Sequence, residues 1–327
     1  MRVRRLTVTV AAILVVIGGT TAYVVTAATE ANDLATNEPA AGAEQVSQAK
    51  SGDLLFVDLA GGQNRVEKIA GGGARTPTEL TCQRFYAAGG TSVCLKLAGP
   101  GPAYAAEISR DGKVVKSVAL PGIPSRAKVS RSGNVVSWTS FVSGDSYSVP
   151  GGFSTRTGFF DVRTGETVES LEHFAATVEG AALTARDVNY WGLTVGSDDR
   201  TFYATLASGG FTWLVKGDLA ANTVTSLRRD AECPSLSPDG TKVAYKKRIG
   251  RLGPWDLAVL DLATSTEKRL PGTAGIDDQA TWLSENELAF AAVPKDAKLP
   301  AVHVTPADGS QPAKVLIPDA TSPSPVT

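Results

Sequence analysis

The sequence predicts an all-β fold built from repeated four-stranded units. Turn formers are abundant, with 33 glycines and 18 prolines among 327 residues. One phrase recurs along the chain: an apolar strand that often ends in an acidic residue, a turn of small residues, and a second strand that finishes on a β-branched residue or leucine. Successive copies lie roughly 40 to 65 residues apart, and four short strands at that period are typical of a β-propeller blade.

Two hairpin types can be distinguished. The first has its clearest copy at residues 255–270, and its relatives lie at 53–69, 104–118, 158–171, 213–227 and 301–316. The second type alternates apolar and polar residues on both sides of a turn. It is clearest at 234–246, with weaker copies at 82–95, 127–138, 192–204 and 280–290. Six outer hairpins predict six blades, with five as the alternative. The first blade lacks its inner hairpin, and no segment is assigned to complete it.

The turn Ser237-Pro238-Asp239-Gly240 has a structural explanation. Proline presets φ, aspartate bonds its own backbone, and glycine takes the positive φ that reverses the strand. This turn, followed by residues 242–245 and 256–261, resembles the WD40-like PD40 repeat of TolB-type β-propellers. The whole chain looks like actinobacterial TolB-like proteins with a membrane signal. Only about 22 residues of linker precede the strands, where TolB has an α/β domain, so no Pal-type or Tol-type partner is implied.

The N-terminus predicts export. Arg2, Arg4 and Arg5 precede an uncharged segment at 6–28, which is the positive-inside pattern. About 23 uncharged residues can span roughly 30 Å of hydrocarbon as a helix, although Thr26-Ala27-Ala28 also suits a signal peptidase. We therefore expect residues 1–28 to anchor the chain in the cell membrane in a single pass, with the C-terminal domain extracellular. The alternative is secretion after cleavage.

The remaining boundaries follow from composition. Residues 29–50 have no aromatic side chain and are expected to form a disordered linker. The propeller is expected to occupy residues 51–318. The segment 319–327 is polar and proline-rich and is expected to be a disordered tail.

Cys82 and Cys94 are expected to form a disulfide bond. They flank a small-residue turn, and a hairpin that turns near residue 88 would place residue 82 opposite residue 94. An exported domain meets the oxidising conditions in which such a bond persists. The alternative is two buried free thiols. Cys233 is left over and is expected to be a buried thiol.

Composition excludes several functional classes. A formal charge of −1 without a long basic run argues against nucleic-acid binding. Two isolated histidines, His173 and His303, and three unclustered cysteines do not make a structural zinc site, and we expect neither a metal nor a cofactor. Gly144-Asp145-Ser146 resembles a trypsin-like nucleophile, but Tyr147-Ser148 follows where two glycines are needed.

Two functional hypotheses remain. The first is a monomeric binding or scaffold propeller for an envelope protein, peptide or glycan, which touches the membrane only through its N-terminal helix. The segment 144–156 would form a rim loop. The residues expected to bind at the channel or rim are Arg156, Asp187, Trp191, Asp199 and Asp278. The alternative is a propeller enzyme acting on envelope glycans or peptides. It would require two of the carboxylates of Asp187, Asp199 and Asp278 to converge in the channel, whereas the acidic pairs 198–199 and 277–278 are also typical of solvated turns.

Overall fold

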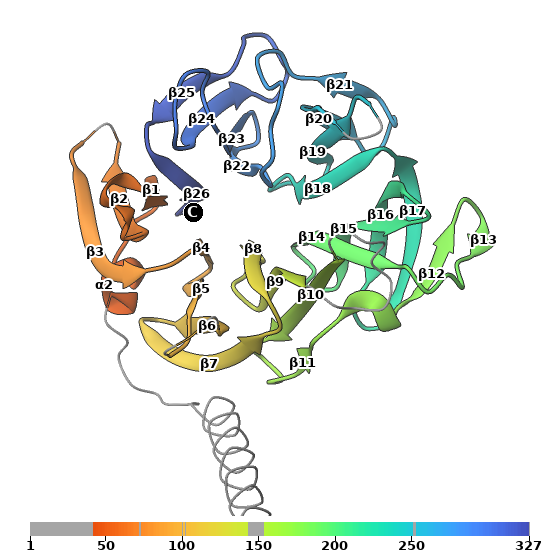
Figure 1. Cartoon of the computed structure of the whole chain (residues 1–327), viewed down its shortest axis with the longest axis horizontal. Coiled ribbons are helices and arrows are strands. Elements are labelled where there is room, and N and C mark those ends of the chain that lie inside the picture. Colours follow the sequence, from red (N-terminus) through yellow and green to blue (C-terminus); the bar gives the residue numbers. More distant parts are fainter. Residues whose placement is uncertain are drawn as a thin grey trace, which may run out of the picture.

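The computed structural model is a six-bladed β-propeller, which confirms the predicted fold class. Six sheets surround a central axis, each with its strands in order from the axis outwards (Figure 1). The structure describes residues 42–71, 73–99, 101, 103–142, 154–250 and 253–326.

Blades 2, 3, 5 and 6 each consist of four consecutive strands. Blade 2 contains β4 (Arg84–Ala88), β5 (Thr91–Leu97), β6 (Tyr104–Arg110) and β7 (Lys113–Leu120). Blade 3 contains β8 (Ile123–Val129), β9 (Val135–Val142), β10 (Ser154–Asp161) and β11 (Thr167–Val168). Blade 5 contains β18 (Ala231–Leu236), β19 (Lys242–Arg248), β20 (Trp255–Asp261) and β21 (Glu267–Arg269). Blade 6 contains β22 (Thr281–Ser284), β23 (Glu287–Ala292), β24 (Ala301–Pro306) and β25 (Lys314–Ile317).

Blade 4 is extended at its outer edge. Its four radial strands are β14 (Asn189–Val195), β15 (Thr201–Ser208), β16 (Phe211–Asp218) and β17 (Thr223–Arg229). The connection from blade 3 passes through the 3-10 turn η2 (Leu171–His173) and adds β12 (Ala175–Val178) and β13 (Ala181–Ala182). Strand β12 pairs in parallel with β17, so this sheet has six strands.

The core lies between blades because each middle strand is covered on both faces. Along β9, seven of eight positions are buried, where a strand with one solvated face would alternate. Between blades 2 and 3, Val93 and Ile108 belong to the same buried cluster as Val136 and Phe160. This packing buries even the polar positions of β9, such as Ser137, Thr139 and Ser140.

The last strand of the chain closes the ring. Strand β26 (Ala320–Pro325) is the innermost strand of blade 1 and pairs with β1 (Asp53–Asp58), beyond which lie β2 (Arg65–Ala70) and β3 (Arg75–Thr81). The expectation of a disordered tail at 319–327 is therefore wrong for this strand. Ala320 and Ser324 are fully buried, and an innermost edge strand tolerates prolines because one side of its backbone has no strand partner.

Because β26 closes the ring, the hairpin at 53–69 has a different place in its blade from the one predicted. The sequence suggested an outer hairpin, but β1 and β2 are the second and third strands of blade 1. The two missing strands come from opposite ends of the domain, β26 on the inside and β3 on the outside. The 3-10 turn η1 (Ala60–Gly62) connects β1 and β2.

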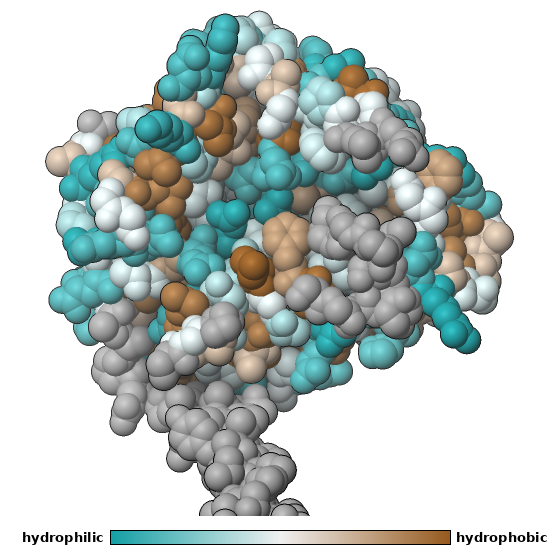
Figure 2. Space-filling view, in the orientation of Figure 1, coloured by the Kyte–Doolittle hydropathy of each residue, from teal (hydrophilic) through white to brown (hydrophobic). Residues whose placement is uncertain are grey.

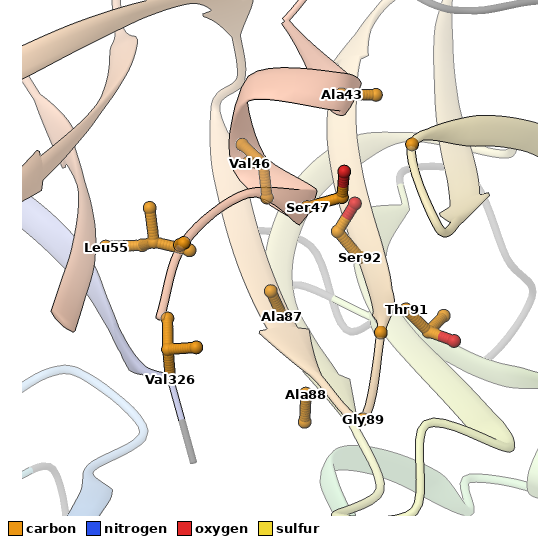
Figure 3. A pocket seen from close by; sticks show the side chains of 13 residues that line it. Ala43, Val46, Ser47, Leu55, Ala87, Ala88, Gly89, Thr91, Ser92 and Val326 are labelled. Carbon is orange, nitrogen blue, oxygen red and sulfur yellow. The ribbon is translucent and has the colours of Figure 1, made fainter. Parts of the chain in front are cut away.

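A short helix, α2 (Ala43–Ser47), packs on the ring ahead of β1. Ala43 and Val46 are buried, and Gln45 Oε1 accepts a hydrogen bond of 2.8 Å from the Glu79 amide. Figure 3 shows this helix beside the β4–β5 hairpin and the chain end at Val326, around a hollow of about 80 Å³. The expectation of disorder over 29–50 is therefore wrong for residues 42–50.

The predicted anchor or signal at 1–28 lies outside the described residues. Among the residues that the structure describes, no helix is both long and apolar enough to cross a membrane.

The disulfide between Cys82 and Cys94 is present, with its Cα atoms 5.3 Å apart. The predicted register is wrong, because Cys94 pairs with Phe85 across β4 and β5. The chain reverses at Gly89 and Gly90, both with positive φ, which shifts the pairing by three positions. Cys82 therefore lies in the connection from β3 to β4, and the bond ties that connection to β5. Cys233 is a buried free thiol, as expected.

Candidate functional site

The middle of the ring is crossed by a segment from blade 6, residues 277–281, which we call the crossing segment. Lys128 of β8 donates a hydrogen bond of 3.1 Å from Nζ to the Ala280 carbonyl. Gln279 donates from Nε2 to the carbonyls of Gly192 in blade 4 (3.0 Å) and Pro234 in blade 5 (2.6 Å). These bonds join the crossing segment to blades 3, 4 and 5, so it lies across the middle of the ring.

Tyr86 adds blade 2 to these contacts. Its hydroxyl lies 2.9 Å from Thr281 Oγ1, and Lys128 Nζ lies 4.2 Å from the centre of its ring. The crossing segment therefore contacts blades 2, 3, 4 and 5.

A pocket of about 370 Å³ opens at one end of the channel, and we call it the mouth pocket. Its aromatic walls come from three blades: Phe141 of β9, Trp191 of β14 and Trp255 of β20. Phe141 pairs across the strands with Ile123, and both are exposed, at 38% and 56%. In the view of Figure 2, hydrophilic side chains gather in the middle of the ring and a few hydrophobic ones adjoin them.

One charged group of the mouth pocket is structural. The Glu232 carboxylate is almost completely buried, and its Oε1 accepts hydrogen bonds from Arg248 Nη2 (2.6 Å), Arg248 Nε (2.9 Å) and Trp255 Nε1 (2.9 Å). The bond to the indole N–H fixes the Trp255 ring, over which Lys246 Nζ lies at 4.4 Å from the ring centre. Glu232 therefore orients the pocket wall.

Asp277 differs, because its side chain is 76% exposed while its partners are buried. Its Oδ1 lies 2.6 Å from Lys246 Nζ and 3.5 Å from Arg126 Nη2. Burial acts to raise the pKa of Asp277, but Lys246, Arg126 and Arg84 together hold that pKa below its ordinary value. One exposed carboxylate thus contacts two buried cations and balances the charge of only one of them.

A second charged group lies deeper in the channel. Arg84, Lys128 and Asp278 line a small hollow behind the mouth pocket. Burial lowers the pKa of Lys128 to about 7, against the pull of Asp278. Burial, followed by repulsion from Arg126, also lowers the pKa of Arg84. Asp278 Oδ2 accepts a hydrogen bond of 2.9 Å from the Ala291 amide.

The three carboxylates of the enzyme hypothesis occupy separate environments. Asp187 precedes β14 and accepts hydrogen bonds of 2.6 Å from Ser208 Oγ and from the Gly209 amide. Both donors lie at the end of β15 and in the turn that follows it. Asp199 is in the turn before β15, so the length of an eight-residue strand, roughly 20 Å or more, separates the two turns. Of the three, only Asp278 borders the channel, in the small hollow that it lines together with Arg84 and Lys128.

Asp199 joins neighbouring blades. Its Oδ1 accepts from Ser130 Oγ (2.9 Å) and Ser132 Oγ (2.5 Å), and its Oδ2 accepts from Asn134 Nδ2 (2.8 Å). All three donors belong to the β8–β9 turn of blade 3. The sequence suggested a ligand-binding carboxylate, and the contacts account for Asp199 as a bridge between blades 3 and 4.

Two further candidates lie near the mouth pocket. Trp191, expected at the channel or rim, is one of the residues that line the pocket. Arg156 is partly buried in β10, opposite Ser140, and its neighbour Thr155 lines the pocket. Most of the rim loop at 144–156 lies outside the described residues, as do Gly144, Asp145 and Ser146.

The repeat-motif turn is structural, as expected. Asp239 accepts from Ser237 Oγ (2.6 Å) and from the amide (3.0 Å) and Oγ1 (2.8 Å) of Thr241, while Gly240 has φ +72°. The Ser237 hydroxyl is the main cause that lowers the pKa of Asp239 to about 2. Pro238 lines a hollow of about 80 Å³ at the other end of the channel.

The charged residues of the mouth pocket were missed from the sequence. The available signal was the alternation of Arg126 and Lys128 on an inner strand, where residues two apart share a face. Within the described residues, no group of three or more His, Cys, Asp or Glu side chains could hold a metal ion.

Comparisons with known proteins identify the fold alone. No protein-family model matches the chain, and no curated protein matches it. Among solved structures, TolB from Acinetobacter baumannii matches with a TM-score of 0.60 at 15% identity, over 84% of this chain and 67% of that one. A putative TolB from Agrobacterium tumefaciens matches with a TM-score of 0.51 at 12% identity, over 85% and 94%.

A chain of a nidogen/laminin complex matches with a TM-score of 0.51 at 10% identity, over 83% of this chain and 97% of that one. All three identities are far below the level at which function follows from similarity. The chain therefore has the six-bladed β-propeller fold of the TolB structures.

Proposed function

We propose that the protein is a binding propeller that acts outside the cytoplasm, tethered by its N-terminal segment, and that the mouth pocket holds a segment of an envelope protein or peptide. One observation carries this proposal. A pocket of about 370 Å³ has aromatic walls from three blades and buried charges at its floor, the composition typical of a recognition site.

The contacts of the carboxylates favour binding over catalysis. General acid–base chemistry needs a carboxyl group that is free to exchange a proton with the substrate. Glu232 is held by Arg248 and Trp255, and Asp277 is held ionised by Lys246 and Arg126. Asp187 and Asp199 are bound in turns at opposite ends of β15. These arrangements serve structure and recognition.

A protein or peptide suits the pocket better than a glycan. Sugar hydroxyls need several hydrogen-bonding side chains, whereas Phe141, Trp191 and Trp255 present rings and the buried polar groups are largely paired with one another. One of the matched folds comes from a complex of two proteins, nidogen and laminin. That similarity supports a protein partner without identifying it.

The location outside the cytoplasm rests on two observations. Three arginines precede the uncharged segment at 6–28, and the disulfide of Cys82 and Cys94 suits an oxidising compartment. Protease added to intact spheroplasts should degrade residues 51–326. Protection of that region until the membrane is permeabilised would refute the orientation.

The pocket is tested by comparing two aromatic substitutions. Full-length chain carrying Trp191→Ala should lose at least tenfold in affinity for a protein captured from envelope extract, because the pocket loses one aromatic wall. Phe211→Ala removes an exposed aromatic ring from the outer part of blade 4 and is the matched control. Equal capture by both variants would exclude the mouth pocket as the binding site.

A further inference from the structure

We propose that the mouth pocket recognises an acidic peptide segment, in which a carboxylate lies next to an apolar side chain. The peptide carboxylate would contact Lys246 and Arg126, the same cations that Asp277 contacts in the free protein. This inference rests on the proposed function, since it names the ligand class of the same pocket. It follows from the balance of charge, from the exposure of Asp277, and from the apolar rim.

The charges around the mouth pocket and the channel behind it are unbalanced. Within the described residues, five cations face three carboxylates. The cations are Arg84, Arg126, Lys128, Lys246 and Arg248, and the carboxylates are Glu232, Asp277 and Asp278. Even with Lys128 neutral, the cations remain in excess. A buried excess of positive charge favours an anionic ligand.

The cations that border the mouth pocket outnumber the carboxylates beside them. Arg248 forms an ion pair with Oε1 of Glu232 at 2.6 Å, whereas Lys246 Nζ lies 4.0 Å from Oε2 of the same carboxylate. Asp277 is therefore the carboxylate that Lys246 and Arg126 share. Arg126 has only carbonyl and hydroxyl acceptors besides, the Ser125 carbonyl (2.9 Å) and hydroxyl (3.2 Å) and the Asp277 carbonyl (3.2 Å). Arg126 Nε is buried and has no acceptor among the described residues, so its guanidinium retains donor capacity. An added carboxylate would supply the missing acceptor atoms.

Asp277 is placed where an incoming carboxylate would meet these cations. It belongs to the crossing segment, and its side chain is 76% exposed although its Oδ1 pairs with the buried Lys246. Its removal therefore leaves two buried cations with less compensation and an open approach. For this reason the loss of Asp277 should strengthen the binding of an anionic ligand, whereas it would weaken the binding of a cationic one.

The apolar rim specifies a peptide. The exposed pair Ile123 and Phe141 lies beside Trp191, next to the buried cations. A free phosphate or a simple acid would leave this surface uncovered. A peptide with an aromatic or leucine residue beside its carboxylate would cover it and gain about 25 cal/mol for each Å² of apolar surface removed from water.

The test uses full-length protein and synthetic hexapeptides that carry leucine or phenylalanine beside a variable position. That position is glutamate, glutamine or lysine, and each peptide is made with a free or an amidated C-terminus. The two series distinguish a side-chain carboxylate from a chain end. Affinity is measured by fluorescence of the pocket tryptophans or by calorimetry at low and high salt. We expect carboxylate-bearing peptides to bind at least tenfold more tightly than their neutral counterparts.

Substitutions of the charged residues should change the affinity for the glutamate peptide in opposite directions. Asp277→Asn should bind the glutamate peptide roughly three- to tenfold more tightly than wild type, and Lys246→Gln should bind it at least tenfold less tightly. Lys246→Arg should restore most of the loss. Asp308→Asn removes an exposed carboxylate from the β24–β25 turn and is the control for net charge. A gain in affinity cannot arise from misfolding, so Asp277→Asn is the decisive variant.

The outcomes separate the two proposals. Weaker binding by Asp277→Asn, or a preference for the lysine peptide, would overturn the acidic ligand while leaving a binding pocket. Equal affinity for the glutamate and glutamine peptides, with binding that still depends on Trp191, would also overturn the acidic ligand and leave the binding pocket. If the captured envelope partner binds equally well to wild type and Trp191→Ala, the proposed function fails together with this inference.

Discussion

Lys128 shows how the ring changes the chemistry of a single side chain. It lies on the innermost strand of blade 3, where its ammonium group reaches the Ala280 carbonyl across the channel and lies over the Tyr86 ring. The sequence contains the alternation of Arg126 and Lys128, but a strand with one solvated face shows the same pattern. Only closure of the ring buries that face, so the charged floor of the mouth pocket could not be separated from ordinary surface charge.

Replacement of Lys128 by methionine should flatten the stability of the protein against pH. The unfolded lysine has a pKa near 10.5 and the folded one about 7, so between these values the unfolded chain binds a proton that the folded chain does not. The free energy of unfolding of wild type should therefore rise, relative to Lys128→Met, as pH increases from 7 to 10. The rise should reach up to about 4 kcal/mol at 1.36 kcal/mol per pH unit.

Urea denaturation at several pH values measures this difference. Lys113→Met removes an exposed lysine from the start of β7 and should give a curve parallel to wild type. Parallel curves for wild type and Lys128→Met would show that the burial of Lys128 does not oppose its charge.

At the level of elements, the hairpins were predictable because each carries its own turn signal. Ten of the eleven predicted hairpins occupy the blade positions expected of them, since a turn and two alternating strands are local features. The register between β4 and β5 was harder to predict from the sequence. The glycines at 89 and 90 both take positive φ, which makes a two-residue turn centred between them, whereas the sequence alone allowed a centre near residue 88.

Loss of the disulfide should destabilise the junction between blades 1 and 2. Cys82 and Cys94 are 12 positions apart, and closing a loop of that size contributes about 3 kcal/mol by restricting the unfolded chain. The double variant Cys82→Ser, Cys94→Ser should therefore have a urea midpoint well below that of wild type. A non-reduced digest analysed by mass spectrometry should show the two peptides joined in wild type.

Reductant provides the control for this prediction. It should lower the midpoint of wild type and leave that of the double variant unchanged, because Cys233 has no cysteine partner among the described residues. An equal response of both proteins would mean that the bond contributes no stability.

For the molecule as a whole, closure depends on a strand with little apolar character. Strand β26 has the sequence ATSPSP, and its burial comes from its place between β1 and the channel. Ser324 Oγ accepts a hydrogen bond of 2.9 Å from the Ala87 amide and donates one of 3.0 Å to the Ala87 carbonyl, which joins blade 1 to blade 2. Hydrophobic periodicity identifies strands by their apolar faces, so this strand was assigned to a tail.

Deletion of residues 320–326 should remove most of the stability of the propeller. The inner edge of β1 would lose its partner, and the buried positions of β26 would become a gap between blades 1 and 2. We expect the truncated chain to unfold at least about 4 kcal/mol more easily, a large fraction of the 5–15 kcal/mol typical of a domain. Calorimetry measures the change, and a synthetic peptide of residues 318–327 added in trans should restore part of it. An unaltered transition in the truncated chain would contradict the closure.

The position of β26 also fixes the order in which the protein can mature. Blade 1 contains the first strand of the ring and the last, so every other blade is synthesised while β1 still presents an open row of backbone donors and acceptors. Such an edge pairs readily with strands of other chains. During synthesis the nascent protein is thus exposed to mispairing until its final residues emerge, and a holding chaperone would act on β1 up to that moment.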